Sequence, residues 1–183
     1  MKSFFKEAVS TFKTTGTIKP SSKYLINDCL KHLDFKKNQI ILEFGPGNGC
    51  ITQELLNRTP TTSRLISFEV NSKFFKHCKK TFKSDTNFTI VNHSAIAFEE
   101  VLKEQGIKKV DYIISSLPLT LLKEEEVISL LEKISKFIKK EGCFVQYQYS
   151  LGKYKMLKKK FAKVNVDFTL RNVPPSFVYK CVV

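Results

Sequence analysis

A short glycine-rich segment, residues 43–49 (EFGPGNG), lies between an apolar run and a helical pattern. Three glycines at alternate positions let the backbone turn tightly and leave no side chain between the chain and a ligand. A dinucleotide-binding loop has its third glycine one position later, in the pattern G-x-G-x-x-G. The shorter spacing behind an acidic residue favours S-adenosylmethionine, which has no pyrophosphate and carries a cationic amine. We therefore predict that this cofactor is bound by Glu43, Gly45, Pro46, Gly47 and Gly49.

A second acidic residue, Glu69, ends the next apolar run, twenty residues after Gly49. A carboxylate at this spacing from a glycine-rich loop accepts hydrogen bonds from the ribose hydroxyls of a nucleoside cofactor. The spacing therefore adds Glu69 and its neighbour Val70 to the predicted cofactor site.

Short apolar runs alternate with helical patterns from residue 39 onward. Strands are predicted over residues 39–44, 64–69, 88–92, 110–115 and 143–149, and the first four are rich in Ile, Val and Phe. Helices are predicted over residues 51–57, 72–82, 98–105 and 123–139. This order implies right-handed crossovers and a parallel, doubly wound sheet.

The C-terminal part extends this sheet. A basic helix over residues 150–162 precedes two strands, 164–170 and 177–183, and a Pro-Pro connection between them is typical of an antiparallel hairpin. The expected fold is α/β and Rossmann-like, with a mostly parallel seven-stranded sheet and an antiparallel C-terminal hairpin. We place this cofactor-binding domain at residues 39–183.

The first 38 residues predict amphipathic, basic helices within the same globular unit. One helical face is apolar and is formed by Phe4, Phe5, Ala8, Val9 and Phe12. We expect this face to lie on a membrane surface or to pack on the domain. A second helix is predicted to start at Pro20 and to run to about Leu33.

The composition excludes several classes of protein. Of the 183 residues, 42% are hydrophobic and 26% charged, so the chain is neither disordered nor built of membrane-spanning helices. Lys6 and Glu7 interrupt the first apolar stretch and argue against a secretory signal. Five cysteines without a C-x-x-C pair exclude a disulfide framework and a tetrahedral zinc site. We expect no bound metal and a cytoplasmic location.

Positive charge is concentrated at the two ends of the chain. The formal net charge is +14, to which residues 1–40 contribute +5, residues 41–149 +2 and residues 150–183 +7. A surface of this kind attracts polyanions, either nucleic acid or an anionic membrane.

Several segments together resemble a known family. They are residues 16–22 (GTIKPSS), 43–52 (EFGPGNGCIT), 115–119 (SSLPL), 144–150 (FVQYQYS) and 171–179 (RNVPPSFVY). With them the chain resembles a class I S-adenosylmethionine-dependent methyltransferase of the ribosomal RNA adenine dimethyltransferase superfamily. Within that group it is most similar to the bacterial phospholipid N-methyltransferases, which methylate phosphatidylethanolamine or related amino lipids.

The resemblance implies roles for particular residues. In the superfamily, a motif after the fourth strand holds the target amine with a polar side chain and a backbone carbonyl. The carbonyls around Ser116 and Leu117 are the candidate amine acceptors here. The predicted catalytic residues are Ser115, Ser116, Leu117, Pro118, Tyr147 and Tyr149, and Ser115 also belongs to the predicted cofactor site. The pattern leaves open which of the two tyrosines faces the substrate.

Two positions depart from the superfamily pattern. The usual Gly-Asp-Ala after the third strand is His93-Ser94-Ala95, so Ser94 and Ala95 are expected to contact the adenine without a charge. The aromatic residue that stacks on a flipped base in nucleic-acid enzymes is replaced by Leu119. A stacking contact of roughly 1–3 kcal/mol per base is then absent. A small amine on a flexible headgroup needs no such contact.

We therefore expect an N-methyltransferase that acts on an amino phospholipid headgroup of the phosphatidylethanolamine type, at the inner face of the membrane. An rRNA adenine N6-methyltransferase is the alternative that the basic charge alone permits. A non-catalytic module that binds anionic lipid or RNA is the third possibility. The proton acceptor for the amine is open between Tyr147, Tyr149, His93 and water. The number of methyl groups added and the oligomeric state are open as well.

Overall fold

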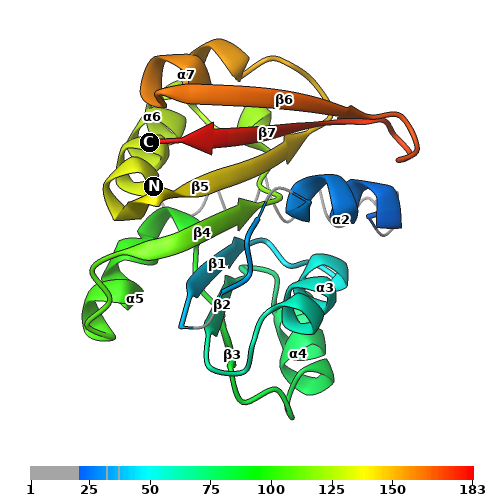
Figure 1. Ribbon diagram of the computed structural model, residues 1–183, viewed down its shortest axis with the longest axis vertical. Coiled ribbons are helices and arrows are strands. Elements are labelled where there is room, and N and C mark those ends of the chain that lie inside the picture. The colour runs from blue at the N-terminus through cyan, green and yellow to red at the C-terminus, as the bar shows by residue number, and fades with distance from the viewer. Residues whose placement is uncertain (1–20, 32, 37) are drawn as a thin grey trace.

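A seven-stranded sheet with the strand order β3-β2-β1-β4-β5-β7-β6 forms the centre of the computed structural model, which describes residues 21–31, 33–36 and 38–183 (Figure 1). The strands are β1 (Ile40–Phe44), β2 (Arg64–Phe68), β3 (Phe88–Val91), β4 (Val110–Ser115), β5 (Ile138–Gln148), β6 (Lys163–Thr169) and β7 (Ser176–Val182). The first five strands pair in parallel, and β7 pairs antiparallel with β5 and β6. The predicted α/β fold with its antiparallel C-terminal hairpin is confirmed.

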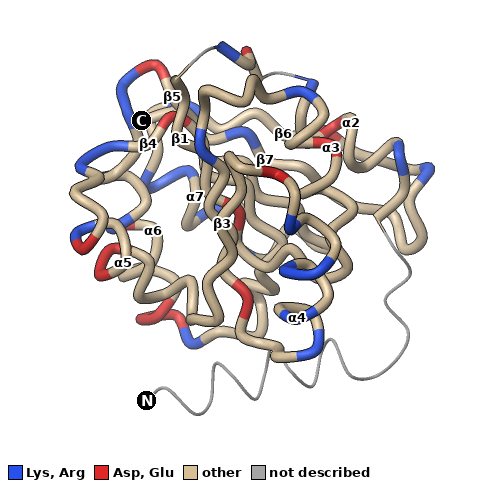
Figure 2. The backbone as a smooth tube through the Cα atoms, turned by 90° about the horizontal axis from the view of Figure 1, so that it is seen from below, with Lys and Arg blue, Asp and Glu red and all other residues tan. Residues whose placement is uncertain are grey.

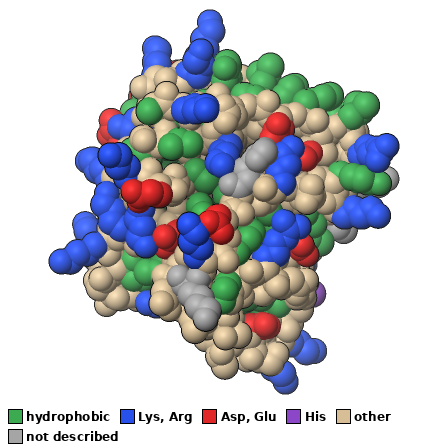
Figure 3. All heavy atoms as spheres, in the orientation of Figure 1, with side chains coloured by type: hydrophobic (Ala, Val, Ile, Leu, Met, Phe, Trp, Pro, Cys, Tyr) green, Lys and Arg blue, Asp and Glu red, His purple; other side chains and the backbone are tan. Residues whose placement is uncertain are grey.

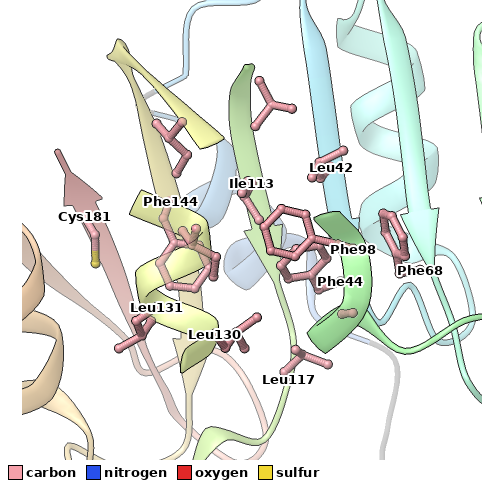
Figure 4. Packing of buried hydrophobic residues seen from close by; sticks show 14 of the residues in the cluster. Leu42, Phe44, Phe68, Phe98, Ile113, Leu117, Leu130, Leu131, Phe144 and Cys181 are labelled. Carbon is pink, nitrogen blue, oxygen red and sulfur yellow. The ribbon is translucent and has the colours of Figure 1, made fainter. Parts of the chain in front are cut away.

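Helices cover both faces of this sheet. They are α2 (Lys23–Leu30), α3 (Cys50–Arg58), α4 (Ser72–Thr81), α5 (Phe98–Glu104), α6 (Glu124–Phe137) and α7 (Tyr154–Lys160), with short 3-10 helices η1 (Ala95–Ala97) and η2 (Leu119–Leu121). Alternate strand residues point to opposite faces. Leu42 and Ile113 therefore pack with residues of α5, α6 and α7 (Figure 4), whereas Ile41 and Tyr112 pack with residues of α2 and α3.

Helix α2 packs on the sheet and belongs to its core. The side chain of Ser22 caps the helix by accepting a hydrogen bond from the Leu25 N–H at 3.2 Å. Leu25, Cys29 and Leu30 are buried in the cluster on this face. The second predicted helix is thus present over Lys23–Leu30. The predicted apolar face of residues 4–12 lies outside the described residues.

Strand β5 starts earlier than its sequence pattern predicted. Helix α6 ends at Phe137 and β5 begins at Ile138, although the prediction continued the helix to residue 139. Ile138 pairs with Val110 of β4, and Lys139 Nζ lies 2.8 Å from Asp111 Oδ1. Pairing with the neighbouring strand therefore overrides the helical pattern at this boundary.

Helix α7 is shorter than predicted and spans Tyr154–Lys160 instead of residues 150–162. The Tyr179 hydroxyl donates a hydrogen bond to the Ser150 carbonyl at 3.0 Å, which holds the preceding residues as a loop against β7. Among the residues that the structure describes, none of the helices has the length and apolar character needed to cross a bilayer.

Candidate active site

The carboxyl ends of β1, β4 and β5 border a pocket of about 400 Å³. Strands β1 and β4 are neighbours at the centre of the sheet, where the direction of chain progression reverses, and ligands bind at such a point in open α/β sheets. The pocket is lined by Ser21, Gly45, Pro46, Gly47, Asn48, Cys50, Ile51, Phe74, Ser116, Leu117, Pro118, Thr120, Tyr147, Gln148, Tyr149 and Ser150. Four segments that the sequence analysis identified, residues 16–22, 43–52, 115–119 and 144–150, thus contribute to one cavity.

The glycine-rich loop leads from β1 into α3. Gly45 N–H donates a hydrogen bond to the Phe68 carbonyl at 2.9 Å. Gly49 has a φ of 84° and precedes the first residue of α3, and a Cβ there would lie 2.8 Å from Phe82 Cε2. Gly47 has a φ of 59°, but a Cβ there would meet no protein atom within 4 Å. Because Gly47 also lines the pocket, its missing side chain leaves room for a ligand.

Glu69 reaches this loop just beyond the end of β2. Its side chain is almost fully buried, and Oε2 accepts a hydrogen bond from the Gly47 N–H at 3.1 Å. The other oxygen, Oε1, accepts one from the Asn71 N–H at 2.9 Å. The carboxylate therefore fixes the part of the loop that lines the pocket. Val70 is half-buried and packs against the core, and the ribose contact of these two residues stays a prediction.

Several predicted cofactor residues are not among the lining residues, namely Glu43, Gly49, Glu69, Val70, Ser94, Ala95 and Ser115. Glu43 is buried, and its Oε2 accepts hydrogen bonds from the hydroxyls of Thr52 at 2.8 Å and Ser67 at 2.6 Å. The Ser94 hydroxyl caps η1, and Ala95 is buried in the core. These contacts position the elements around the pocket, and a direct cofactor contact of Glu43, Ser94 and Ala95 stays a prediction.

The loop after β4 is tied to the glycine-rich loop. Ser115 is buried, and its hydroxyl accepts a hydrogen bond from the Leu117 N–H at 3.2 Å. The Ser116 hydroxyl donates a hydrogen bond to the Gly45 carbonyl. Ser116, Leu117 and Pro118 all line the pocket, so the predicted catalytic motif faces the predicted cofactor loop.

Two glutamines of β5 hold the Leu117 carbonyl. Gln146 Nε2 donates a hydrogen bond to it at 3.0 Å, and Gln148 Nε2 donates one at 3.3 Å. A carbonyl oxygen has two lone pairs, so a substrate amine would compete with both amides for Leu117. The sequence reasoning missed these glutamines. The sequence could have indicated them, because two glutamines in the predicted strand over residues 143–149 need hydrogen-bond partners if that strand is buried.

Tyr147 and Tyr149 both line the pocket, and their ring centroids are 6.3 Å apart. Burial raises the pKa of Tyr147, the neighbouring Tyr149 raises it further, and hydrogen bonds with Ser21 and Ser116 act in the opposite direction. Burial raises the pKa of Tyr149 as well. Both side chains are therefore neutral phenols at pH 7, and neither is suited to take a proton from a substrate.

We expect Tyr147→Phe to keep most of the transfer rate, with a loss of about two- to tenfold, because a neutral hydrogen bond contributes roughly 0.5–1.5 kcal/mol. The pH–rate profile should keep its shape, as measured from initial rates between about pH 6 and pH 10. Tyr149→Phe is the matched variant in the same pocket. Loss of one limb of the profile in Tyr147→Phe alone would identify Tyr147 as the base.

The residues of the pocket fit S-adenosylmethionine. Space beside Gly47, a buried carboxylate bonded to the loop, and apolar lining by Ile51 and Phe74 suit a nucleoside with a charged side chain. Within the described ranges, no three His, Cys, Asp or Glu side chains form a group that could hold a metal ion.

Solved structures with a similar fold include methyltransferases. The TM-score is 0.69 with precorrin-6y C5,15-methyltransferase from Geobacter metallireducens, at 16% identity over 87% of this chain and 88% of that one. It is 0.70 with phosphoethanolamine N-methyltransferase 1 from Haemonchus contortus, solved with phosphoethanolamine and S-adenosylhomocysteine, at 14% identity over 100% of this chain and 50% of that one. These identities establish the fold. The protein falls in the class of S-adenosylmethionine-dependent methyltransferases.

Sequence comparison identifies the family. Residues 21–139 match the ribosomal RNA adenine dimethylase family, and the chain belongs to it. The ornithine lipid N-methyltransferase of Singulisphaera acidiphila is 25% identical over 185 residues, which cover 99% of this chain and 96% of that protein. The ribosomal RNA small subunit methyltransferase A of Mycoplasma mycoides subsp. mycoides is 32% identical over 126 residues, which cover 64% of this chain and 45% of that protein. The chain thus spans less than half of the second relative.

Proposed function

We propose that the protein is an N-methyltransferase that acts on the amino headgroup of a phospholipid of the phosphatidylethanolamine type, at a membrane surface. The observation that carries this proposal is the similarity to an ornithine lipid N-methyltransferase over nearly the full length of both chains. The similarity to an rRNA methyltransferase covers less than half of that relative. The fold similarity to a phosphoethanolamine N-methyltransferase agrees with an amine of this type.

The pocket supports a small amine better than a nucleobase. Leu119, which replaces the stacking aromatic residue of nucleic-acid enzymes, is fully buried and does not line the pocket. Aromatic lining comes instead from Tyr147 near the end of β5, from Tyr149 just after that strand, and from Phe74 of α4. The Tyr147 and Tyr149 rings have an interplanar angle of 73°. Aromatic faces attract an ammonium group, including a methylated one.

Catalysis by this chain is mainly positioning. S-adenosylmethionine, when bound, supplies an electrophilic methyl group. We assign its binding to the 45–49 loop and Glu69. The Ser116 carbonyl and the Tyr147 phenol oxygen accept hydrogen bonds from the substrate amine, which orients its lone pair for in-line attack.

The amine attacks only after it has lost a proton. Tyr147 and Tyr149 are protonated at pH 7, because the ordinary pKa of a phenol is about 10 and burial raises the pKa of both groups further. His93 does not line the pocket, and its Nδ1 lies 3.3 Å from the Ser94 carbonyl oxygen. We therefore propose that water accepts the proton that the substrate amine loses.

The proposal predicts where a radioactive methyl group goes. The protein is incubated with labelled S-adenosylmethionine and with phosphatidylethanolamine vesicles, ornithine lipid vesicles or small ribosomal subunits. We expect label in the extracted phosphatidylethanolamine, because the aromatic faces of Tyr147 and Tyr149 attract its ammonium group. Gly47→Leu serves as the control for contaminating activity. Label in ornithine lipid with none in phosphatidylethanolamine would overturn the proposed headgroup. Label in ribosomal RNA with none in either lipid would overturn the proposal as a whole.

An rRNA adenine N6-methyltransferase is the second candidate. The family match and the net charge of +14 favour it, because a basic surface attracts RNA. The ribosomal arm of the same experiment decides between the two substrates.

A further inference from the structure

Large exposed hydrophobic side chains gather around the mouth of the pocket. Tyr149 lines the pocket and is partly exposed. Leu121 and Leu151 are about half exposed, and each directly follows a lining residue, Thr120 and Ser150 respectively. The loops that carry them are neighbours, because a Cβ at position 152 would lie 3.6 Å from Thr120 Cγ2. Three exposed hydrophobic side chains thus belong to the pocket lining or to the residue directly after it.

The β6–β7 hairpin carries a second group of such side chains. Val166, Phe168 and Leu170 alternate along the edge strand β6 and the residue that follows it, so they share one face. Leu170 is 70% exposed, and Val173 in the turn is 69% exposed. These are the largest exposed fractions among the exposed hydrophobic side chains of the described residues.

Helix α2 supports the opposite face of the hairpin. The Thr169 hydroxyl donates a hydrogen bond to Asp28, and Asp167 Oδ2 lies 3.3 Å from Lys31 Nζ. The polar face of β6 is therefore held by α2. The apolar face of β6 stays exposed. Its Phe168 ring contacts the Phe177 ring of β7, with the centroids 4.9 Å apart, and is still about half exposed.

The hairpin turn is fixed close to the pocket. The Ser22 N–H donates a hydrogen bond to Asn172 Oδ1 in the turn at 3.0 Å, and Ser22 is next to Ser21 in the pocket lining. Gln148, also in the lining, pairs with Phe177 of β7. Figure 1 shows the turn beside α2, on the side toward which the arrowheads of β4 and β5 point.

Basic side chains accompany these apolar groups. Residues 150–183 contain eight Lys and Arg residues and one Asp. Arg171 lies in the turn itself, with its guanidinium 5.1 Å from the Tyr24 ring centroid. Basic positions also occur along other elements, including α4 (Figure 2). Figure 3 shows hydrophobic side chains along the margin of the molecule over β6, with Lys and Arg side chains nearby.

We infer that a membrane-contact surface surrounds the pocket mouth, which we call the rim surface and which consists of Leu121, Tyr149, Leu151, Phe168, Leu170 and Val173. These side chains enter the headgroup region of an anionic bilayer while the neighbouring cations contact phosphates. The pocket then opens toward the amine of a lipid in that bilayer. The identity of the lipid substrate in this inference rests on the proposed function. The binding of the rim surface to a bilayer does not depend on it.

The chemistry of the rim surface favours a bilayer over RNA. Four of its six residues are Leu or Val, whose side chains offer no ring face to a base. A bilayer interface accepts aliphatic side chains from separate loops without a shaped partner surface.

The test uses the full chain and vesicles of equal amounts of phosphatidylglycerol and phosphatidylcholine. The double variant Leu170→Ser/Val173→Ser should lower vesicle partition, measured by co-sedimentation, by at least about tenfold, since two large apolar side chains leave the interface. Ile128→Ser is the matched control, because Ile128 is 45% exposed on α6, outside the rim surface. It should bind vesicles as the original protein does. Equal thermal midpoints confirm that both variants fold.

A second measurement separates this inference from the proposed function. The double variant should lose methyl transfer to phosphatidylethanolamine in vesicles and keep transfer to a short-chain phosphatidylethanolamine in solution. If the original protein labels neither lipid, the proposed function fails, and vesicle partition still decides the role of the rim surface. Vesicle binding by the double variant equal to that of Ile128→Ser would overturn the inference. So would loss of binding to a ribosomal RNA fragment with vesicle binding unchanged.

Discussion

Gly47→Leu is expected to lower the affinity for S-adenosylmethionine by more than about a hundredfold, as measured by titration calorimetry. The new side chain has no protein atom within 4 Å of its Cβ position and belongs to the pocket lining, so it occupies space that the ligand needs. The φ of 59° adds backbone strain of about 1–2 kcal/mol for a residue with a side chain.

Gly106 provides the matched control for that strain. Its φ is 68°, and a Cβ there also meets no protein atom within 4 Å, but it follows α5 and does not line the pocket. Gly106→Leu should therefore lose a similar amount of stability and keep its affinity for the cofactor. Equal losses of affinity in the two variants would show that backbone strain, not the occupied space, explains the result.

Glu69→Ala is expected to weaken cofactor binding by roughly ten- to a hundredfold, because hydrogen bonds to a charged group contribute about 1.5–3 kcal/mol. The change removes the predicted ribose contact and also the acceptor of the Gly47 N–H. Both effects act on the same side of the pocket. Calorimetric titration of the purified variant measures the combined loss.

The surface acid Glu54 supplies the control for a change in net charge. Glu54 lies on α3 and pairs with Arg58 at 2.7 Å. Glu54→Ala removes the same charge without touching the glycine-rich loop, so its affinity for the cofactor should be unchanged. An unchanged affinity in Glu69→Ala would remove Glu69 from the cofactor site.

Local sequence patterns were sufficient to predict the sheet and the position of the glycine-rich loop at the end of its first strand. A run such as residues 40–44 (IILEF) is buried on both faces, so its apolar composition alone predicts a central strand. The glycine spacing requires no partner elsewhere in the chain, and the loop lies where strand order predicts a ligand site. Features that depend only on neighbours in sequence could therefore be predicted.

Features that depend on contacts between neighbouring strands could not be predicted from local sequence patterns. Gly142 has no positive φ, yet a Cβ there would collide with the Asp111 carbonyl, because β4 and β5 approach each other closely at a register shift. The role of Gln146 and Gln148 likewise depends on the position of the Leu117 carbonyl. Residues separated by about thirty positions meet only once the register of β4 and β5 is known.

The loop between β4 and η2 is held in place by uncharged groups. Amide donors from Gln146 and Gln148 hold the Leu117 carbonyl, and the Ser116 hydroxyl joins the loop to Gly45. Dissolved salt screens attraction between exposed charges but leaves such neutral hydrogen bonds intact. For the proposed membrane enzyme, a higher ionic strength should therefore lower the number of protein molecules bound to an anionic bilayer, while the turnover of each bound molecule stays constant. We then expect salt to change the amount of membrane-bound enzyme and not its rate constant.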